Sequence, residues 1–543
     1  DRKNPKRFDL SKRIDIVCFC TLAISAILPL VGFGAYFRNE DARYLVWLSK
    51  SPGILDAFHL SVRYHPLTFR PASEIMLRIV YRLFGSNPLA FQATSGLLFI
   101  GAAVIFYKIV KLLFNNRSIA FLSVLVFFSC FYFSLHFLYT PIQGLQFPAE
   151  LILTASVIFL LLKDLKNGRL GSSFIVSILL TVIAIFTHPV SAFLLPLLGI
   201  TLIVIYWRKC REERSVKKTL FIALFALLWL TIPIVTKQGE AKLLGISAPY
   251  EYIPIMLRRY LSYSRIFLRG FNLVLITIPL FYSLSRFLVS RLLFDPSNEK
   301  HKLVVCSAIF VVAGLILVRI LPREASFIVL SIVLLATAFI DRVRLFLVIW
   351  FFGGMAPILV SPVITGVYVR HAAMALSVVL GMAYWEIITE VVKSIKGRFD
   401  NIDRVFSLNR IAVFLTVIAA VLVIVAKYNV LRVPIVDRQI DQVNYLKCMG
   451  NNFRDMLIFL CERLDRDSRV YFFKGPSRKK EDGYVYTRTH LERLQPAKRN
   501  HYPFYFEIYG RGDIVVSFTD ELSSGHDESK GERKILVATN NWE

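Results

Sequence analysis

Apolar runs of membrane-spanning length recur along this chain and constrain its fold more than any other feature. A helix needs about 20 mostly apolar residues to cross the hydrocarbon core of a bilayer. Runs near that length occur at 14–37, 88–110, 118–135, 147–162, 171–187, 190–207, 219–236, 270–290, 302–318, 325–340, 345–360, 366–385 and 410–427. Hydrophobic residues make up 55% of the 543 positions, and the mean hydropathy is +0.56. The sequence therefore predicts an all-α polytopic membrane protein with about 13 transmembrane helices.

Positive charge is concentrated between these runs. The formal net charge is +27. Residues 428–543 contribute little to it, because they hold 19 Lys and Arg and 17 Asp and Glu. An excess of Lys and Arg between spans is typical of cytoplasmic loops, so the charge does not indicate a nucleic-acid partner. The basic clusters lie at 2–13, 108–117, 163–169, 208–218, 286–302, 341–344 and 393–404. They all face one side if the short run 72–84 does not cross, which predicts a cytoplasmic N-terminus and an extracytoplasmic C-terminus.

The run 72–84 is expected to lie in the membrane interface. It has thirteen residues and carries Glu74, Arg78 and Arg82, which suits an interfacial helix better than a crossing one. The first apolar run, 14–37, ends in Phe-Arg without a small-residue cleavage site, so we expect it to be a retained signal anchor. Residues 38–87 then form the first external loop.

Two domains are predicted. Residues 1–427 form the transmembrane domain, and residues 428–543 form a small extracytoplasmic C-terminal α/β domain. In the latter we expect a helix around 436–464, followed by strands in the runs 469–473, 513–518 and 535–538. Four of the seven cysteines lie in apolar runs, so no disulfide framework is expected; Cys448 and Cys461 can pair only if the helix breaks between them.

Away from the cytoplasmic rim, ionisable residues within the spans lie near the predicted outer ends, and the span centres carry almost none. Ion-coupled transporters usually keep charged or broken-helix sites near the membrane midplane. The distribution therefore argues against transport and indicates a function at the outer membrane surface.

An acidic pair, Glu40 and Asp41, stands where the first span emerges on the outer side. Carboxylates at this position can cap a helix that begins near Ala42, an effect worth about 0.3–1 kcal/mol. A carboxylate beside a lipid-linked phosphate can instead act as a general base on an acceptor hydroxyl. The pattern alone leaves both interpretations open.

An ordered set of motifs around this pair resembles the GT-C glycosyltransferases, integral membrane enzymes that take sugar from a polyprenyl-phosphate donor. The set consists of the acidic pair, Arg-Tyr at 43–44, and a proline-led helix in 70-RPASEIMLRIVYRLFGSNPLAFQ-92 followed by a long apolar span. It is most similar to the branch containing protein O-mannosyltransferases and the lipid A aminoarabinose transferase. The likeness is good over about 14–135 and weaker to about 385. It implies a GT-C fold, with thirteen spans and an external C-terminal domain in the aminoarabinose branch.

The resemblance also implies site residues. Glu40 falls where the family has its base aspartate and Asp41 where it has a glutamate, so either acid can be the base, and we favour Asp41. In 367-VYVRHAAMALSVVLG-381, Arg370 matches an arginine that acts at the donor phosphate, and His371 replaces a tyrosine. Some relatives bind a divalent metal at the acidic loop, which here would be Mg²⁺ or Mn²⁺ on Glu40 and Asp41.

Further candidates surround this core set. Arg63, Arg70, Arg258 and Arg259 can grip a lipid phosphate, because guanidinium groups bind phosphate bidentately. The arginines at 258 and 259 can equally contact anionic headgroups. Three residues are possible parts of the cavity: His65, His188 and Glu150. His188 can equally be a structural cap before Pro189, and Glu150 a solvated helix-end charge.

The sequence thus predicts an inverting glycosyltransferase of the cell envelope, in a prokaryotic plasma membrane, working at the extracytoplasmic face. Its expected partners are a polyprenyl-phosphate-linked sugar, membrane lipids, and an acceptor protein, glycolipid or glycan. The alternatives are a lipid or glycan transporter or flippase, and a non-catalytic scaffold on a GT-C fold.

Overall fold

A computed structural model describes fourteen stretches of the chain. They are residues 41–50, 53–57, 70–129, 141–167, 172–206, 254, 257, 260–261, 273–292, 300–360, 369–398, 469–473, 515–519 and 534–538. The predicted spans 14–37, 219–236 and 410–427 and the predicted helix 436–464 lie outside them.

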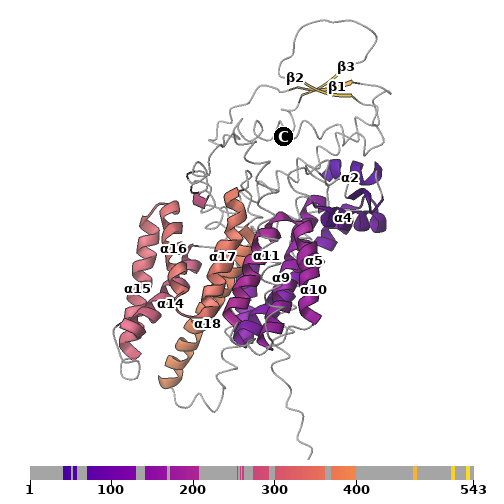
Figure 1. Ribbon diagram of the computed structural model, residues 1–543. Helices are drawn as coiled ribbons and strands as arrows, with labels where there is room; N and C mark the ends of the chain where they lie inside the picture. Colours follow the sequence, from indigo (N-terminus) through magenta and orange to yellow (C-terminus); the bar gives the residue numbers. More distant parts are fainter. Residues whose placement is uncertain are drawn as a thin grey trace, which may run out of the picture.

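The described part is a bundle of long helices with two short helices at one end (Figure 1). The bundle helices are α5 (Pro88–Phe114), α6 (Arg117–Ser129), α9 (Pro141–Lys166), α10 (Ser172–Thr187), α11 (Pro189–Tyr206), α14 (Leu273–Leu292), α15 (Lys300–Ile320), α16 (Arg323–Thr337), α17 (Arg342–Val360) and α18 (Arg370–Arg398). Each overlaps one of the predicted apolar runs. The short helices are α2 (Asp41–Lys50) and α4 (Pro71–Phe84), and the end of the bundle where they lie is called the α4 end.

Three helices in the described stretches are long and apolar enough to cross a membrane: Pro88–Phe114, Gly144–Lys166 and Arg370–Val391. Large apolar side chains are exposed along α10, α15 and α16, such as Leu179, Ile309, Ile316 and Ile332. Exposed apolar faces of this extent fit contact with lipid tails. The protein is therefore a helical integral membrane protein, and the expected total of thirteen crossings stays a prediction.

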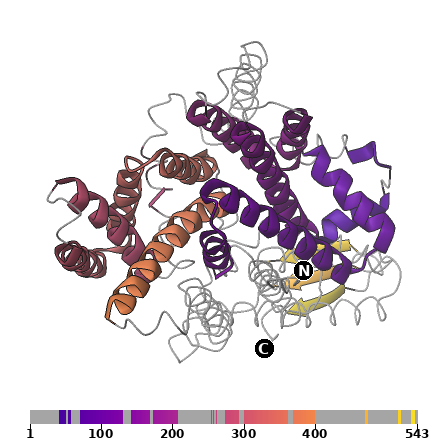
Figure 2. The ribbon, with the colours of Figure 1, turned by 90° about the horizontal axis from the view of Figure 1, so that it is seen from below.

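Helix α18 lies between two groups of helices. Figure 2 shows α14, α15 and α16 on one side of it and the group around α5 and α9 on the other. Packing of α18 against α6, α14 and α17 agrees with this view. The small residues of α18, including Ala372, Ala373 and Ala375, are fully buried, as expected for a central helix that its neighbours approach closely.

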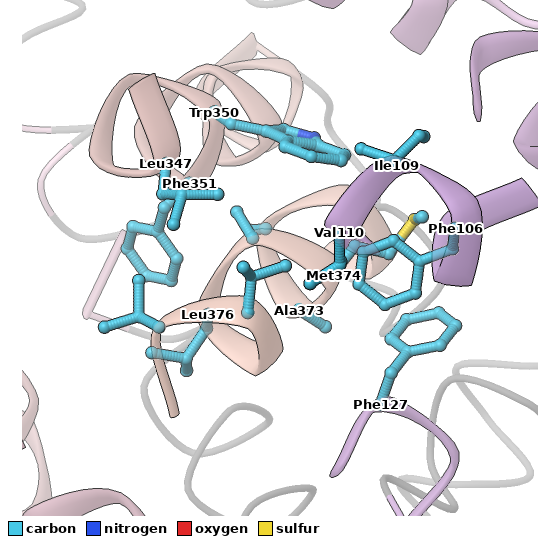
Figure 3. Packing of buried hydrophobic residues seen from close by; sticks show 14 of the residues in the cluster. Phe106, Ile109, Val110, Phe127, Leu347, Trp350, Phe351, Ala373, Met374 and Leu376 are labelled. Carbon is cyan, nitrogen blue, oxygen red and sulfur yellow. The ribbon is translucent and has the colours of Figure 1, made fainter. Parts of the chain in front are cut away.

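The main hydrophobic core joins α5, α6, α17 and α18 (Figure 3). Phe106 of α5 contacts both Phe127 and Trp350, with ring centroids 5.7 and 6.4 Å away and edge-to-face geometry. Val110 and Met374 fill the space beside these rings. Interlocking aromatic contacts of this kind fix how the helices are rotated relative to one another.

Helices α17 and α18 approach each other backbone to backbone. A β-carbon at Gly354 would lie 2.5 Å from the backbone nitrogen of Ala372, so only glycine fits there. Ten residues earlier on α17, Nη2 of Arg344 donates to Oε1 of Glu386 on α18 at 2.7 Å. The pair is held at two separate points along its length.

Helices α2 and α4 pack on the bundle through a second apolar cluster. Its members are Tyr44, Leu45, Trp47, Leu48, Leu77, Val80, Phe91, Ile142 and Leu145. They come from α2, α4 and the first turns of α5 and α9. The start of α2, at Asp41, is therefore tied to the end of the bundle where α9 begins.

A helix forms over the predicted run, as α4, and its position in the membrane interface stays a prediction. Pro71 occupies its first turn, where the missing N–H costs nothing, and Gly85 ends it with a positive φ of 60°. Two of its charged residues, Glu74 and Arg78, are buried. Only Arg82 of the three is exposed.

Three strands form a parallel sheet in the C-terminal region. They are β1 (Arg469–Phe473), β2 (Val515–Thr519) and β3 (Lys534–Ala538), in the order β2-β1-β3. Arg469 pairs with Val515 on one side and with Lys534 on the other. Each strand overlaps a run in which the sequence predicts one.

Candidate active site

Glu150, on α9, is the centre of a buried polar cluster at the α4 end. Its side chain has no exposed surface, and it follows Gln146 and precedes Thr154 by one helical turn each, so the three share one face of α9. The Thr154 hydroxyl donates to Oε1 of Glu150 at 3.0 Å. An ionised carboxylate can be buried in this way only if donors surround it.

The first residues of α18 supply the strongest of these donors. Arg370 directs Nε and Nη2 to Oε2 of Glu150, at 3.1 and 2.5 Å. Nε2 of His371 lies 2.8 Å from Oε1 and 3.0 Å from Oε2. Since a carboxylate only accepts, the imidazole donates through Nε2. Nδ1 of His371 is buried and has no hydrogen-bond partner among the described residues.

The turn between α10 and α11 closes a third side of the cluster. The hydroxyl of Ser191 donates to Oε1 of Glu150 and lies 3.1 Å from the Thr154 hydroxyl. Nδ1 of His188 accepts from the backbone N–H of Val190 at 3.3 Å, so this side chain caps the start of α11. The capping interpretation of His188 is thus supported, and the residue nevertheless lies beside the cluster.

Phe147 and Arg70 extend the cluster toward α4. The Arg370 guanidinium lies over the Phe147 ring at 4.9 Å, and the His188 ring lies 5.4 Å from the same ring. Arg70, immediately before α4, donates through Nη1 to Oε1 of Gln146 at 3.0 Å. Two guanidinium groups therefore contact successive turns of α9, one at Gln146 and one at Glu150.

This geometry holds Arg370 in a fixed orientation. Two of its nitrogens share one carboxylate oxygen, and a ring supports its face. Charge-assisted bonds of this kind are shorter and about twice as strong as neutral ones. Because Arg370 is held by Glu150 and Arg70 lies one turn of α9 away, bonded to neutral Gln146, the cluster suits recognition of an anionic group.

The Glu150 carboxylate does not fit a role as a metal ligand, because four side chains already donate to it. Across the described stretches, no group of three or more His, Cys, Asp or Glu is arranged to hold a metal ion. The predicted metal ligands are Glu40, which lies outside the described residues, and Asp41, of which only the backbone is described. A metal at the acidic loop therefore stays a prediction.

The structure brings several of the predicted site residues together. Glu150, His188, Arg370 and His371 meet in one cluster, and Arg70 lies one turn of α9 away. Four others lie outside the described residues: Arg63, His65, Arg258 and Arg259.

Sequence reasoning missed Gln146, Thr154 and Ser191. The polar residues at 146, 150 and 154 repeat every four positions in the stretch 145–155, whose other residues are apolar, and this spacing was a usable signal. No comparable pattern marks Ser191, because its contact with Glu150 joins residues 41 positions apart.

Comparisons with known proteins add little to this description. No family model matches the sequence, and no curated protein matches it. One similar solved structure is the crystal structure of ArnT from Cupriavidus metallidurans in the apo state. It has a TM-score of 0.41 and 12% sequence identity, covering 95% of this chain and 87% of that one. Similarity at this level assigns neither an activity nor site residues.

Proposed function

We propose that this membrane protein is an inverting glycosyltransferase that moves a sugar from a polyprenyl-phosphate donor to an acceptor hydroxyl at the extracytoplasmic face. The observation that carries the proposal is the buried cluster in which Glu150 holds Arg370 and His371, with Arg70 beside it. The cluster lies at the end of the bundle where α2 begins at Asp41.

The proposed reaction is a single displacement. Asp41 or Glu40 takes the proton of the acceptor hydroxyl, and the oxygen attacks the anomeric carbon from the face opposite the phosphate. The bond from that carbon to the phosphate oxygen breaks, and polyprenyl phosphate leaves with the electron pair. One substitution at the anomeric carbon inverts its configuration.

Arg370 is proposed to stabilise the leaving phosphate, together with one or more of Arg63, Arg70 and the pair Arg258–Arg259. A guanidinium carries five N–H donors in a rigid plane. Its contact with Glu150 fixes that plane before any substrate arrives, and donors fixed in advance need no reorganisation during the reaction. The buried Nδ1 of His371 is a further polar atom suited to a ligand contact. A divalent cation, if bound by Glu40 and Asp41, would add positive charge near the phosphate.

The test separates donor binding from turnover. Undecaprenyl phosphate binding is measured by native mass spectrometry, and donor consumption in nanodiscs is measured with a panel of undecaprenyl-phosphate sugars. We expect Arg370→Lys to weaken phosphate binding by about tenfold, because a point charge replaces a bidentate group. Asp41→Asn with Glu40→Gln should retain binding and lose about 100-fold or more of turnover.

Ser156→Ala is the matched control, since this hydroxyl on α9 donates to the helix's own Ile152 carbonyl. Binding of undecaprenyl phosphate without consumption of any donor by the wild-type protein would favour the scaffold, and full activity in the double acid variant would show that neither Asp41 nor Glu40 is the base. Movement of the intact lipid across the bilayer without sugar transfer would favour the flippase.

A further inference from the structure

Helix α4 has an unusual distribution of side chains. Its exposed side carries Ile79, Leu83 and Phe84, at 45, 70 and 54% exposure. Its buried side carries Glu74 and Arg78, one turn apart. A helix with its apolar face outward fits a position against lipid, but burial of charge against α5, α9 and α10 needs its own explanation.

Of these residues, Arg78 has the largest unmet need for hydrogen-bond acceptors. Only 1% of its surface is exposed, and none of its three guanidinium nitrogens has a hydrogen-bond partner in the described part of the chain. A buried donor without an acceptor costs about 1–3 kcal/mol, and more when it is charged. Such groups are rare in folded proteins, and each one calls for a specific reason.

The neighbouring acids balance this charge only in part. Glu74 interacts electrostatically with both Arg78 and Arg70, and burial raises the pKa of Glu74 to about 7. Near neutral pH the carboxyl is therefore protonated for much of the time. Asp56 also interacts with Arg78, but its Oδ2 accepts from the backbone N–H of Gly53 at 3.0 Å and so closes a local turn.

We propose that Arg78 anchors an anion site beneath α4 that takes a phosphate group. Five N–H donors in a fork match the oxygens of phosphate better than any single carboxylate. The phosphate belongs either to the headgroup of an anionic lipid or to a soluble phosphate. The exposed apolar side of α4 brings lipid headgroups within reach of the helix.

Anion binding at Arg78 does not depend on the proposed reaction. Arg370 already has acceptors on Glu150, whereas Arg78 has none among the described residues. Binding at Arg78 can therefore be measured without any turnover assay, and its failure would leave the proposed transferase untouched.

The experiment compares the wild-type protein, Arg78→Gln, Arg78→Lys and the exposed control Arg82→Gln in detergent. One arm titrates inorganic phosphate at constant ionic strength. The other adds dioleoyl phosphatidic acid or phosphatidylglycerol, with phosphatidylcholine as the neutral lipid. Binding is followed by native mass spectrometry and by the rise in Tm.

We expect phosphate-bearing ligands to bind the wild-type protein and the Arg82→Gln variant alike. Arg78→Gln should bind about tenfold more weakly or worse, and Arg78→Lys should fall between. Response to inorganic phosphate identifies a soluble ligand, and response to anionic lipid alone identifies a headgroup. Equal binding by the wild-type protein and Arg78→Gln, or no binding of any phosphate species, would overturn the proposal. If Arg78→Gln does not fold, the Arg78→Lys comparison decides in the same way.

Discussion

Two buried arginines at the α4 end differ in the hydrogen-bond acceptors that surround them. Arg370 is 3% exposed and bonds Glu150 through two nitrogens, while Arg78 is 1% exposed and has no acceptor in the described stretches. Burial alone therefore does not show how the donors of a buried arginine are satisfied. The difference lies in whether the chain itself satisfies the donors, and each prediction below tests one side of that contrast.

The largest expected effect comes from Glu150→Ala. This change leaves Arg370 and His371 buried without their shared acceptor, and breaking a buried pair from one side costs about 3–5 kcal/mol. Thermal unfolding in detergent, followed by circular dichroism, should show a clear loss of Tm. Ser156→Ala, on the same helix, should change little. A Tm close to that of the wild-type protein would mean that the cluster does not stabilise the fold.

Glu74 should make stability depend on pH. Its pKa is about 7 in the folded protein against an ordinary value of 4.5, so the folded state keeps this proton to higher pH than the unfolded chain. Below pH 4.5 both states are protonated and nothing changes. As pH rises from 4.5 to about 7 the unfolded state loses its proton first, so stability falls, by up to about 3 kcal/mol.

The measurement for this prediction is Tm at pH 5 and pH 8 for the wild-type protein and Glu74→Gln. The amide cannot ionise, so the variant should lose less stability than the wild-type protein over this interval. Identical pH profiles would show that Glu74 does not titrate differently in the fold.

Ser191→Ala should have a smaller effect on the stability of the cluster that holds Arg370. The change removes one of the donors to Glu150 but leaves Arg370, His371 and Thr154 in place. A hydrogen bond to a charged group contributes about 2 kcal/mol. Chemical denaturation should show this loss. In combination with Glu150→Ala the effect of Ser191→Ala should nearly vanish, because both changes disrupt the same contact.

Arg78→Met should have the smallest effect, and its sign sharpens the comparison. Replacing an unsatisfied buried charge with an apolar side chain removes a desolvation cost, so in the absence of ligand Tm should stay level or rise by an amount equivalent to about 1 kcal/mol. Differential scanning fluorimetry of delipidated protein measures this. A strong decrease in Tm would show that Arg78 stabilises the fold and is not an unsatisfied charge.

The sequence predicted the elements well where local chemistry decides them. Pro71 and Gly85 bound α4, and Pro189 separates α10 from α11, close to the expected positions. The meeting of Glu150 with Arg370 joins residues 220 positions apart, and no local pattern encodes such a distance. The resemblance pointed to Arg370 and His371, but not to the partner that holds them.

The burial of Glu74 and Arg78 could not be predicted from the sequence, for a different reason. In water, apolar side chains face the protein and charges face the solvent, so the pattern of a helix shows which side is buried. Beside a membrane the lipid is as apolar as the protein interior, and this rule no longer applies. On α4 apolar side chains lie on both sides, with Leu83 exposed and Leu77 buried, so the pattern does not show on which side Arg78 lies.

The close contact of Gly354 with Ala372 has a mechanical consequence. Together with the bond from Arg344 to Glu386, it prevents α17 and α18 from sliding past each other, so Arg370 moves only when both helices move. Helix α4 meets the bundle through side chains such as Leu77 and Val80, which can repack. Admission of a lipid-sized molecule should then shift α4 while the α17–α18 hairpin stays still. Spin-label distances measured from each of these helices to α9, with and without lipid, would reveal which one moves.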